Sequence, residues 1–242
     1  MEQVPGEKPP APLPSGGPPP RWGLGDFLWI YPAGILLSVI GVSIGFAITG
    51  DEAGHTGAVT TALAAFGQFG GWVGCVAYVA HAKGRSLRDD FGLRLDVRDW
   101  WAVFAGMGLF VVATLLILPL HDMVNESQQV VDDLNAATGA KLAVFAVVAA
   151  LVAPVSEELL FRGLLLRSLR RRFPPAIAIG VQALVFALAH PLLSPTLGDL
   201  VVVPALLLLG LASGLAAEAK GDLSASILMH IGFNLITTLA AL

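Results

Sequence analysis

The sequence predicts an all-α protein, a polytopic bundle of about seven membrane-spanning helices with a cytosolic N-terminus. Two observations on composition indicate a membrane protein. Of the 242 residues, 55% are hydrophobic and only 13% are charged, and the mean hydropathy is +0.76. A soluble domain usually carries about 25% charged residues, so a chain this apolar needs lipid around most of its surface. The net charge of −4 does not indicate nucleic-acid binding, and no nucleic-acid partner is expected.

The chain begins with a segment that cannot form a core. Its first 20 residues contain eight prolines and almost no large apolar side chains. Residues 1–22 are therefore predicted to form a disordered, Pro-rich cytosolic tail. The segment lacks the charged-then-apolar layout of a cleaved signal peptide, so the first hydrophobic run is expected to be retained.

Hydrophobic runs long enough to cross the bilayer follow this tail. A span needs roughly 20 mainly apolar residues. Seven runs qualify, at residues 27–49, 58–80, 100–120, 141–166, 174–191, 200–218 and 223–242. The first three spans fall within residues 23–139, which are expected to form accessory transmembrane helices, and the last four fall within residues 140–242. Residues 83–99 mix charges with apolar side chains and are predicted to lie along the inner membrane surface.

The distribution of lysine and arginine, the third observation, orients these spans. Positive charges mark cytosolic loops. They gather after the second span and again after the fourth, whereas the loops after the first, third and fifth spans have none or a single lysine at the end. This alternation places the N-terminus inside the cell and supports the count of seven. The protein is expected in the plasma membrane, with its site open toward the cytosol.

Three charged residues lie inside the fourth predicted span, in the segment APVSEELLFRG. A charged side chain near the centre of a membrane helix costs roughly 2.5–3.5 kcal/mol by insertion scales. Glu158 and Arg162 are four residues apart and share a helix face, so they can form an ion pair. Glu157 points about 100° away from Glu158, so it needs another partner or a polar cavity.

Two later spans offer polar partners for that carboxylate. The segment FALAH carries Phe186 and His190, and the segment HIGFN carries His230 and Asn234. Each pair is spaced by four residues and therefore lies on one face of its helix.

The turn between the fourth and fifth spans predicts that these groups lie at similar depth. Glu157 lies 16 residues before Phe173 in this turn, and His190 lies 17 residues after it. In an antiparallel hairpin both levels are roughly 24–26 Å from the turn. His230 lies about 12 Å beyond Asp222 at the inner side. A carboxylate, two imidazoles and an amide can therefore converge within the membrane.

Such a group of side chains suits hydrolysis by either of two routes. A carboxylate beside an imidazole can deprotonate a water, while imidazole and amide groups donate hydrogen bonds to an oxyanion. Alternatively, Glu157, His190 and His230 can ligate a divalent metal such as zinc. The sequence has no HExxH or GxSxG motif, and its single cysteine, Cys75, lies in an apolar run.

The three motifs together resemble a known family. EELLFRG fits an EExxxR pattern, FALAH fits FxxxH, and HIGFN fits HxxxN, in this order. They are similar to those of the CPBP intramembrane proteases, which include type II CAAX prenyl endopeptidases and the bacteriocin self-protection proteins called Abi. The resemblance covers about residues 140–242 and implies that they form the catalytic transmembrane core.

This resemblance implies a role for each motif position. Glu157 would be the general base that activates water together with His190. His230 and Asn234 would support the oxyanion, or His230 would join Glu157 and His190 as a metal ligand in a metalloprotease. Supporting roles are implied for three further residues: Glu158, Arg162 and Phe186.

The predicted function is therefore that of an intramembrane endopeptidase, with membrane lipid as its surroundings. Its substrate would be a membrane-associated protein or peptide, or a prenylated CAAX-type substrate. Two alternatives belong to other classes. One is a proton-coupled transporter, because membrane-embedded glutamate and histidine also mark ion pathways, although no internal repeat is found. The other is a non-catalytic membrane scaffold or immunity protein.

Overall fold

The computed structural model describes residues 21–52, 55–121, 137, 139–191 and 200–240, and all its regular elements are helices. Within these ranges no strand occurs, and a single bridge joins Glu52 and His55. The all-α prediction is confirmed. In chain order the elements are α1 (Leu24–Thr49), α2 (Ala58–Ala65), η1 (Phe66–Gly70), α3 (Gly71–Lys83), α4 (Leu87–Phe91), η2 (Val97–Asp99), α5 (Trp101–His121), α7 (Gly139–Val147), η3 (Val148–Val152), α8 (Ala153–Glu158), η4 (Leu159–Leu166), α9 (Arg167–Arg170), α10 (Pro175–Ala189), α12 (Val203–Lys220) and α13 (Ser224–Ala240).

Five stretches of helix in the described residues are long and apolar enough to cross a membrane. They are Leu24–Thr49, Ala58–Lys83, Val97–Pro119, Gly139–Arg170 and Val203–Lys220. The two other predicted spans correspond to shorter apolar helices, Pro175–Ala189 and Ser224–Leu239. The chain is therefore a multi-pass membrane protein. The cytosolic position of the N-terminus stays a prediction.

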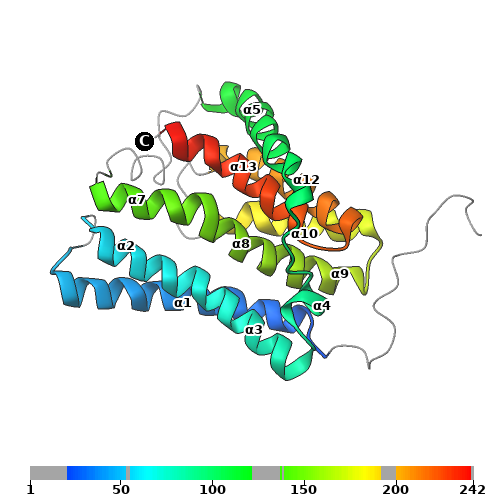
Figure 1. Ribbon diagram of the computed structural model, residues 1–242, viewed down its shortest axis with the longest axis horizontal. Coiled ribbons are helices and arrows are strands. Elements are labelled where there is room, and N and C mark those ends of the chain that lie inside the picture. Colours follow the sequence, from blue (N-terminus) through cyan, green and yellow to red (C-terminus); the bar gives the residue numbers. More distant parts are fainter. Residues whose placement is uncertain (1–20, 53–54, 122–136, 138, 192–199, 241–242) are drawn as a thin grey trace, which may run out of the picture.

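The helix from Gly139 to Arg170 lies at the centre of the molecule. It runs between α1, α2 and α3 on one side and α5, α10, α12 and α13 on the other (Figure 1). Every side chain of its η4 segment is buried. This explains how a helix with three charged residues can be held inside the bundle, because protein surrounds that part of it.

Two segments of this central helix, η3 and η4, have the wider π-helical turn. Pro154 is the second residue after the end of η3. A proline has no N–H to donate and its ring crowds the carbonyl four residues earlier, here Ala150, so the turn before it widens. Turns of this kind are rare and are often found at functional sites.

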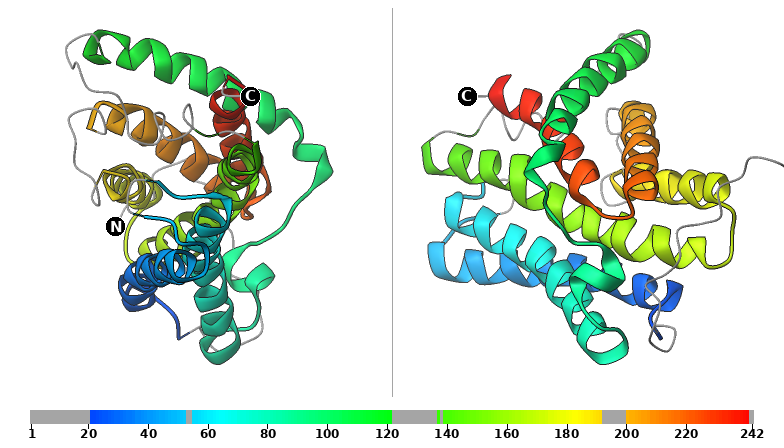
Figure 2. Two further views of the ribbon diagram at one scale, coloured as in Figure 1. Left: turned by 90° about the vertical axis from the view of Figure 1, so that its left-hand side faces the viewer. Right: turned by 45° about the vertical axis from the view of Figure 1, so that its right-hand side comes forward.

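Helix α13 packs along α5 at very short range (Figure 2). A side chain at Gly106 of α5 would collide with the Met229 carbonyl oxygen, and one at Gly232 would collide with the Val103 carbonyl oxygen. Both positions therefore need glycine for the backbones to approach this closely. This contact fixes the position of the part of α13 that carries His230.

At the end of the bundle that carries α9, arginine side chains connect α9 and the turn after it to neighbouring segments. Arg171 lies over the Trp22 ring, 3.7 Å from its centroid, and Arg167 donates to the carbonyl oxygens of Asp90 and Gly221. Trp22 is buried against Phe91, although the predicted tail extends to residue 22. Residues 1–20 of that tail lie outside the described residues.

Candidate active site

The predicted site residues come from three helical segments that meet inside the bundle. Glu157 and Glu158 end α8, and Arg162 lies one turn later in η4. His190 directly follows α10, and His230 lies in the middle of α13. The convergence expected from the spacing around the turn is present for the carboxylate of Glu157 and the two imidazoles.

A fully buried ion pair forms one side of the site. The Arg162 Nη1 atom lies 2.9 Å from Glu158 Oε1, and both side chains have 0% exposure. The same carboxylate oxygen lies 3.0 Å from His230 Nδ1. Because Glu158 is paired with a cation, it acts as acceptor and the His230 Nδ1–H as donor. Glu158 thus fixes the orientation of the His230 ring.

Glu157 forms the other, more open side. Its Oε2 atom lies 3.7 Å from His230 Nε2 and 4.0 Å from His190 Nε2. These distances are too long for direct hydrogen bonds. They suit a water that contacts both partners, as polar groups separated by more than 3.5 Å often do. The Glu157 side chain is 12% exposed and that of His190 is 35% exposed, so this side is accessible.

The hydrogen bonds of the two histidines determine which nitrogen faces Glu157. His190 Nδ1 lies 2.9 Å from the Phe186 carbonyl oxygen, which can only accept. His190 Nδ1 therefore carries the hydrogen, and in the neutral ring Nε2 is an acceptor. The hydrogen bond to Glu158 likewise places a hydrogen on His230 Nδ1, so Nε2 is an acceptor in the neutral His230 ring. Both Nε2 atoms are thus directed to one carboxylate.

Phe186 lies between the two sides of the site. The Arg162 guanidinium is 4.3 Å from its ring centroid, a cation–π contact. The rings of His190 and His230 contact the Phe186 ring edge to face, at centroid distances of 4.9 and 5.8 Å. Phe186, predicted as a supporting residue, therefore lies between Arg162 and the His190 ring.

Asn234 does not join this group directly. Its side-chain N–H₂ donates to the Ala149 carbonyl oxygen at 2.9 Å, within the η3 segment. The widened turn leaves this carbonyl available to a partner on a neighbouring helix. Only one of the two amide hydrogens is needed for that bond. The role of Asn234 at an oxyanion stays a prediction.

The predicted metal ligands are of the right chemical type, but their spacing in this structure is slightly wider than that of ligands around one zinc ion. Glu157, His190 and His230 offer a carboxylate and two imidazoles, as catalytic zinc sites do. Tetrahedral zinc ligands lie about 3.4 Å apart, less than the two distances given above. In the part of the chain that the structure describes, no group of three or more His, Cys, Asp or Glu side chains has the arrangement of a metal site. Binding of a divalent metal such as zinc stays a prediction.

One residue beside the site was missed from the sequence. Tyr31 of α1 donates its hydroxyl hydrogen to the Ala189 carbonyl oxygen, at 3.1 Å, directly before His190. A signal for it existed, because a tyrosine inside a predicted span needs a partner for its hydroxyl. The sequence could not tell which helix supplies that partner.

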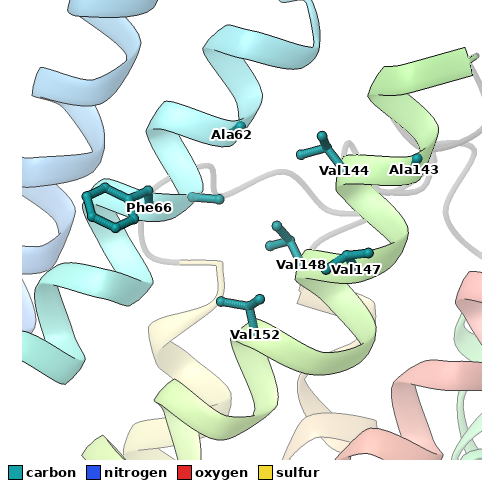
Figure 3. A pocket seen from close by; sticks show the side chains of 8 residues that line it. Ala62, Phe66, Ala143, Val144, Val147, Val148 and Val152 are labelled. Atoms are coloured by element: carbon teal, nitrogen blue, oxygen red, sulfur yellow. The ribbon is translucent and has the colours of Figure 1, made fainter.

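An apolar groove lies between the α2–η1 segment and the first half of the central helix. Ala62 and Phe66 line one wall, and Val144, Val148 and Val152 line the other (Figure 3). The groove has a volume of about 440 Å³. Val152 lies only five residues before Glu157. Five residues correspond to a rise of about 7.5 Å and a rotation of about 140°, so the groove and the carboxylate lie on different faces of the central helix.

Comparison with known proteins gives a match to the part of the chain that contains the predicted motifs. A family model described as type II CAAX prenyl endopeptidase, Rce1-like, matches residues 139–236. This segment belongs to the Rce1-like family. The match confirms the CPBP resemblance and contains the three predicted motifs, from Glu157 to Asn234.

The Rce1-like family is a family of proteases, and its match starts and ends within the same helices that build the site. Residues 21–121, which form α1 to α5, lie outside the match. No curated protein and no solved structure matches the chain. The role of the first five helices must therefore be argued from their contacts.

Proposed function

We propose that the protein is an intramembrane endopeptidase that hydrolyses a peptide bond in a membrane-associated protein or in a prenylated CAAX-type substrate. The observation that carries this proposal is the position of Glu157. Its carboxylate faces the Nε2 atoms of two histidines, at 3.7 and 4.0 Å, in a partly open site within a protease family segment.

Glu157 and His190 are proposed to activate a water between them. An oxygen about 2.8 Å from both acceptors can direct one hydrogen to the carboxylate and the other to His190 Nε2. Its lone pairs then face away from both acceptors, toward the substrate. As the oxygen bonds to the scissile carbonyl carbon, Glu157 takes the proton. A general base in this position typically contributes 10²–10⁴-fold to the rate.

The attack leaves negative charge on the former carbonyl oxygen. His230, when doubly protonated, can donate its Nε2–H to that oxygen, and Asn234 can donate its second amide hydrogen. One such donor is worth about 2.7–4 kcal/mol in a site without bulk water. When the carbon–nitrogen bond breaks, the proton on Glu157 moves to the leaving amine. The sequence of steps consumes one water and restores the carboxylate.

The apolar groove supports the membrane-bound character of the substrate. Its walls consist of alanine, valine and phenylalanine side chains. Such a surface binds hydrocarbon and gives no hydrogen-bonding specificity. A prenyl group is one occupant of this kind, in agreement with the substrate in the family description.

The test compares new protein termini in membranes of cells that make equal amounts of wild type, Glu157→Gln or His190→Ala. Termini that appear with wild type alone would support the peptidase and name its substrate. Both substitutions should lower cleavage at least 10²-fold with little effect on folding. Glu52→Gln, a substitution of an exposed glutamate outside the site, is the matched control. Identical termini in all strains would contradict peptidase activity and favour the transporter or scaffold alternatives.

A further inference from the structure

Tyr31 lies outside the segment that matches the protease family, on helix α1, yet it contacts the site. Its hydroxyl donates to the carbonyl oxygen of the peptide bond between Ala189 and His190. This peptide directly precedes the imidazole that faces Glu157. The hydroxyl thus restrains the backbone from which the His190 side chain extends.

The end of α10 needs such a contact because of the residue that follows it. The last carbonyls of a helix have no partner within the helix. Pro191 has no N–H, so it cannot donate to the Ala187 carbonyl as another residue would. The residue before a proline is disfavoured in the α region, yet His190 has helical dihedrals, φ −72° and ψ −52°. Contacts from outside the helix therefore hold this turn.

Tyr31 itself is firmly held. Its ring stacks on Trp72 of α3 at a centroid distance of 5.7 Å and an interplanar angle of 19°. The Trp72 Nε1–H donates to the Tyr31 carbonyl oxygen at 3.0 Å. A side chain at Gly34 would collide with the Trp72 indole, so this close packing requires glycine there. The hydroxyl is consequently presented from a rigid position.

A second set of contacts leads from Tyr31 to His190 through aromatic rings. Tyr31 meets Phe161 edge to face at 6.3 Å, and Phe161 meets Phe186 at 5.2 Å. Phe186 in turn contacts the His190 ring at 4.9 Å. Removal of the hydroxyl alone leaves these ring contacts in place. The two routes can therefore be separated by substitution.

We propose that Tyr31 is a positioning residue for His190, so that helix α1 forms part of the catalytic unit although no motif lies on it. The hydroxyl holds the last turn of α10, and this turn keeps His190 Nε2 directed to Glu157. The inference rests on the proposed peptidase function. Tyr31 acts on His190 through its hydrogen bond to the Ala189 carbonyl oxygen and through the surrounding aromatic rings. The proposed role requires no direct contact between Tyr31 and the substrate.

The test uses Tyr31→Phe, with Tyr78→Phe as its matched control. Tyr78, on α3, is 63% exposed, so loss of its hydroxyl should change nothing. Hydrogen–deuterium exchange of residues 183–190 in the full-length protein should become faster in Tyr31→Phe and stay at the wild-type rate in Tyr78→Phe. This measurement needs no substrate. The thermal unfolding midpoint should stay within two degrees or so of wild type.

The kinetic measurement uses cleavage of a farnesylated peptide that ends in a CAAX sequence. In Tyr31→Phe, kcat should fall about 5- to 20-fold with KM within about twofold, because misplacement by 1 Å can cost about 10²-fold. A residue that only stabilised the fold would not separate kcat from KM in this way.

Two results would overturn the proposal. One is wild-type exchange at residues 183–190 in Tyr31→Phe, and the other is faster exchange with an unchanged kcat. If the wild type does not cleave the peptide, that result contradicts the prenylated substrate in the proposed function. The exchange measurement still decides whether Tyr31 holds the turn of His190.

Discussion

Two arginine–carboxylate pairs in this protein have the same length and opposite surroundings. Arg162 and Glu158 are 2.9 Å apart in the bundle with both side chains at 0% exposure. Arg98 and Asp96 are also 2.9 Å apart, but their side chains are 87% and 26% exposed. Removal of one partner from a buried pair leaves a charge without water or counter-ion, whereas an exposed charge is hydrated again. Distance alone therefore says little about what either pair contributes.

The buried pair also has a function that the exposed pair lacks. Glu158 accepts from His230 and so orients a ring that faces Glu157. Its neighbour Glu157 faces two imidazoles instead of an arginine and is 12% exposed. Two adjacent glutamates are thus assigned different roles by their surroundings.

The largest expected effect is that of Arg162→Met. It leaves Glu158 buried without its cation, and the free energy of unfolding should fall by about 3–5 kcal/mol. Denaturant unfolding in detergent micelles measures this loss, and Arg98→Met is the control. The double variant Glu158→Leu with Arg162→Met should recover most of the stability but little activity, since His230 then lacks its acceptor. An equal effect of Arg162→Met and Arg98→Met would show that burial is not the deciding factor.

A smaller effect is expected at Asn234, on the open side of the site. Asn234→Ala should lower kcat about 10- to 100-fold and change KM less, if the amide donates to the oxyanion. Loss of the bond to Ala149 should reduce stability by about 0.5–2 kcal/mol, as for other polar contacts between membrane helices. Steady-state kinetics and thermal unfolding separate the two effects. Reduced stability with unchanged kcat would assign Asn234 to the helix contact alone.

The smallest effect concerns the exposed pair and depends on pH. Hydrogen bonds from the Arg98 side chain and backbone lower the pKa of Asp96 to about 2. A carboxyl group whose pKa is lower in the folded protein stabilises the fold above its unfolded pKa, near 4, and loses this contribution as the pH falls toward 2. Asp96→Asn should therefore lower the unfolding midpoint slightly at pH 6 and not at pH 2. A difference that grows toward pH 2 would contradict this sign.

Much of this architecture follows from local sequence information. Composition predicts the membrane helices, and the distances of Glu157 and His190 from the turn at Phe173 predict that they meet. The i, i+4 spacing of Glu158 and Arg162 predicts their pairing, because helix geometry fixes which side chains share a face. These features depend on distances along one or two helices.

The remainder depends on how helices rotate and pack against one another. The sequence did not indicate that Asn234 binds Ala149, that Phe186 covers Arg162, or that Tyr31 reaches Ala189. Each of these contacts joins side chains or backbone of two different helices. The fifth predicted span, residues 174–191, also extends two residues beyond the end of α10 at Ala189. Periodicity gives no information on such ends.

The close crossing of α5 and α13 has a consequence for natural variation. Gly106 carries no functional group, but a side chain there would push against the backbone at Met229, next to His230. A codon change to alanine would leave every motif residue intact and still move one imidazole away from the glutamate. A motif search would classify that allele as active. Surveys of homologous genes should therefore score position 106 together with the motifs when they separate working copies from inactive ones.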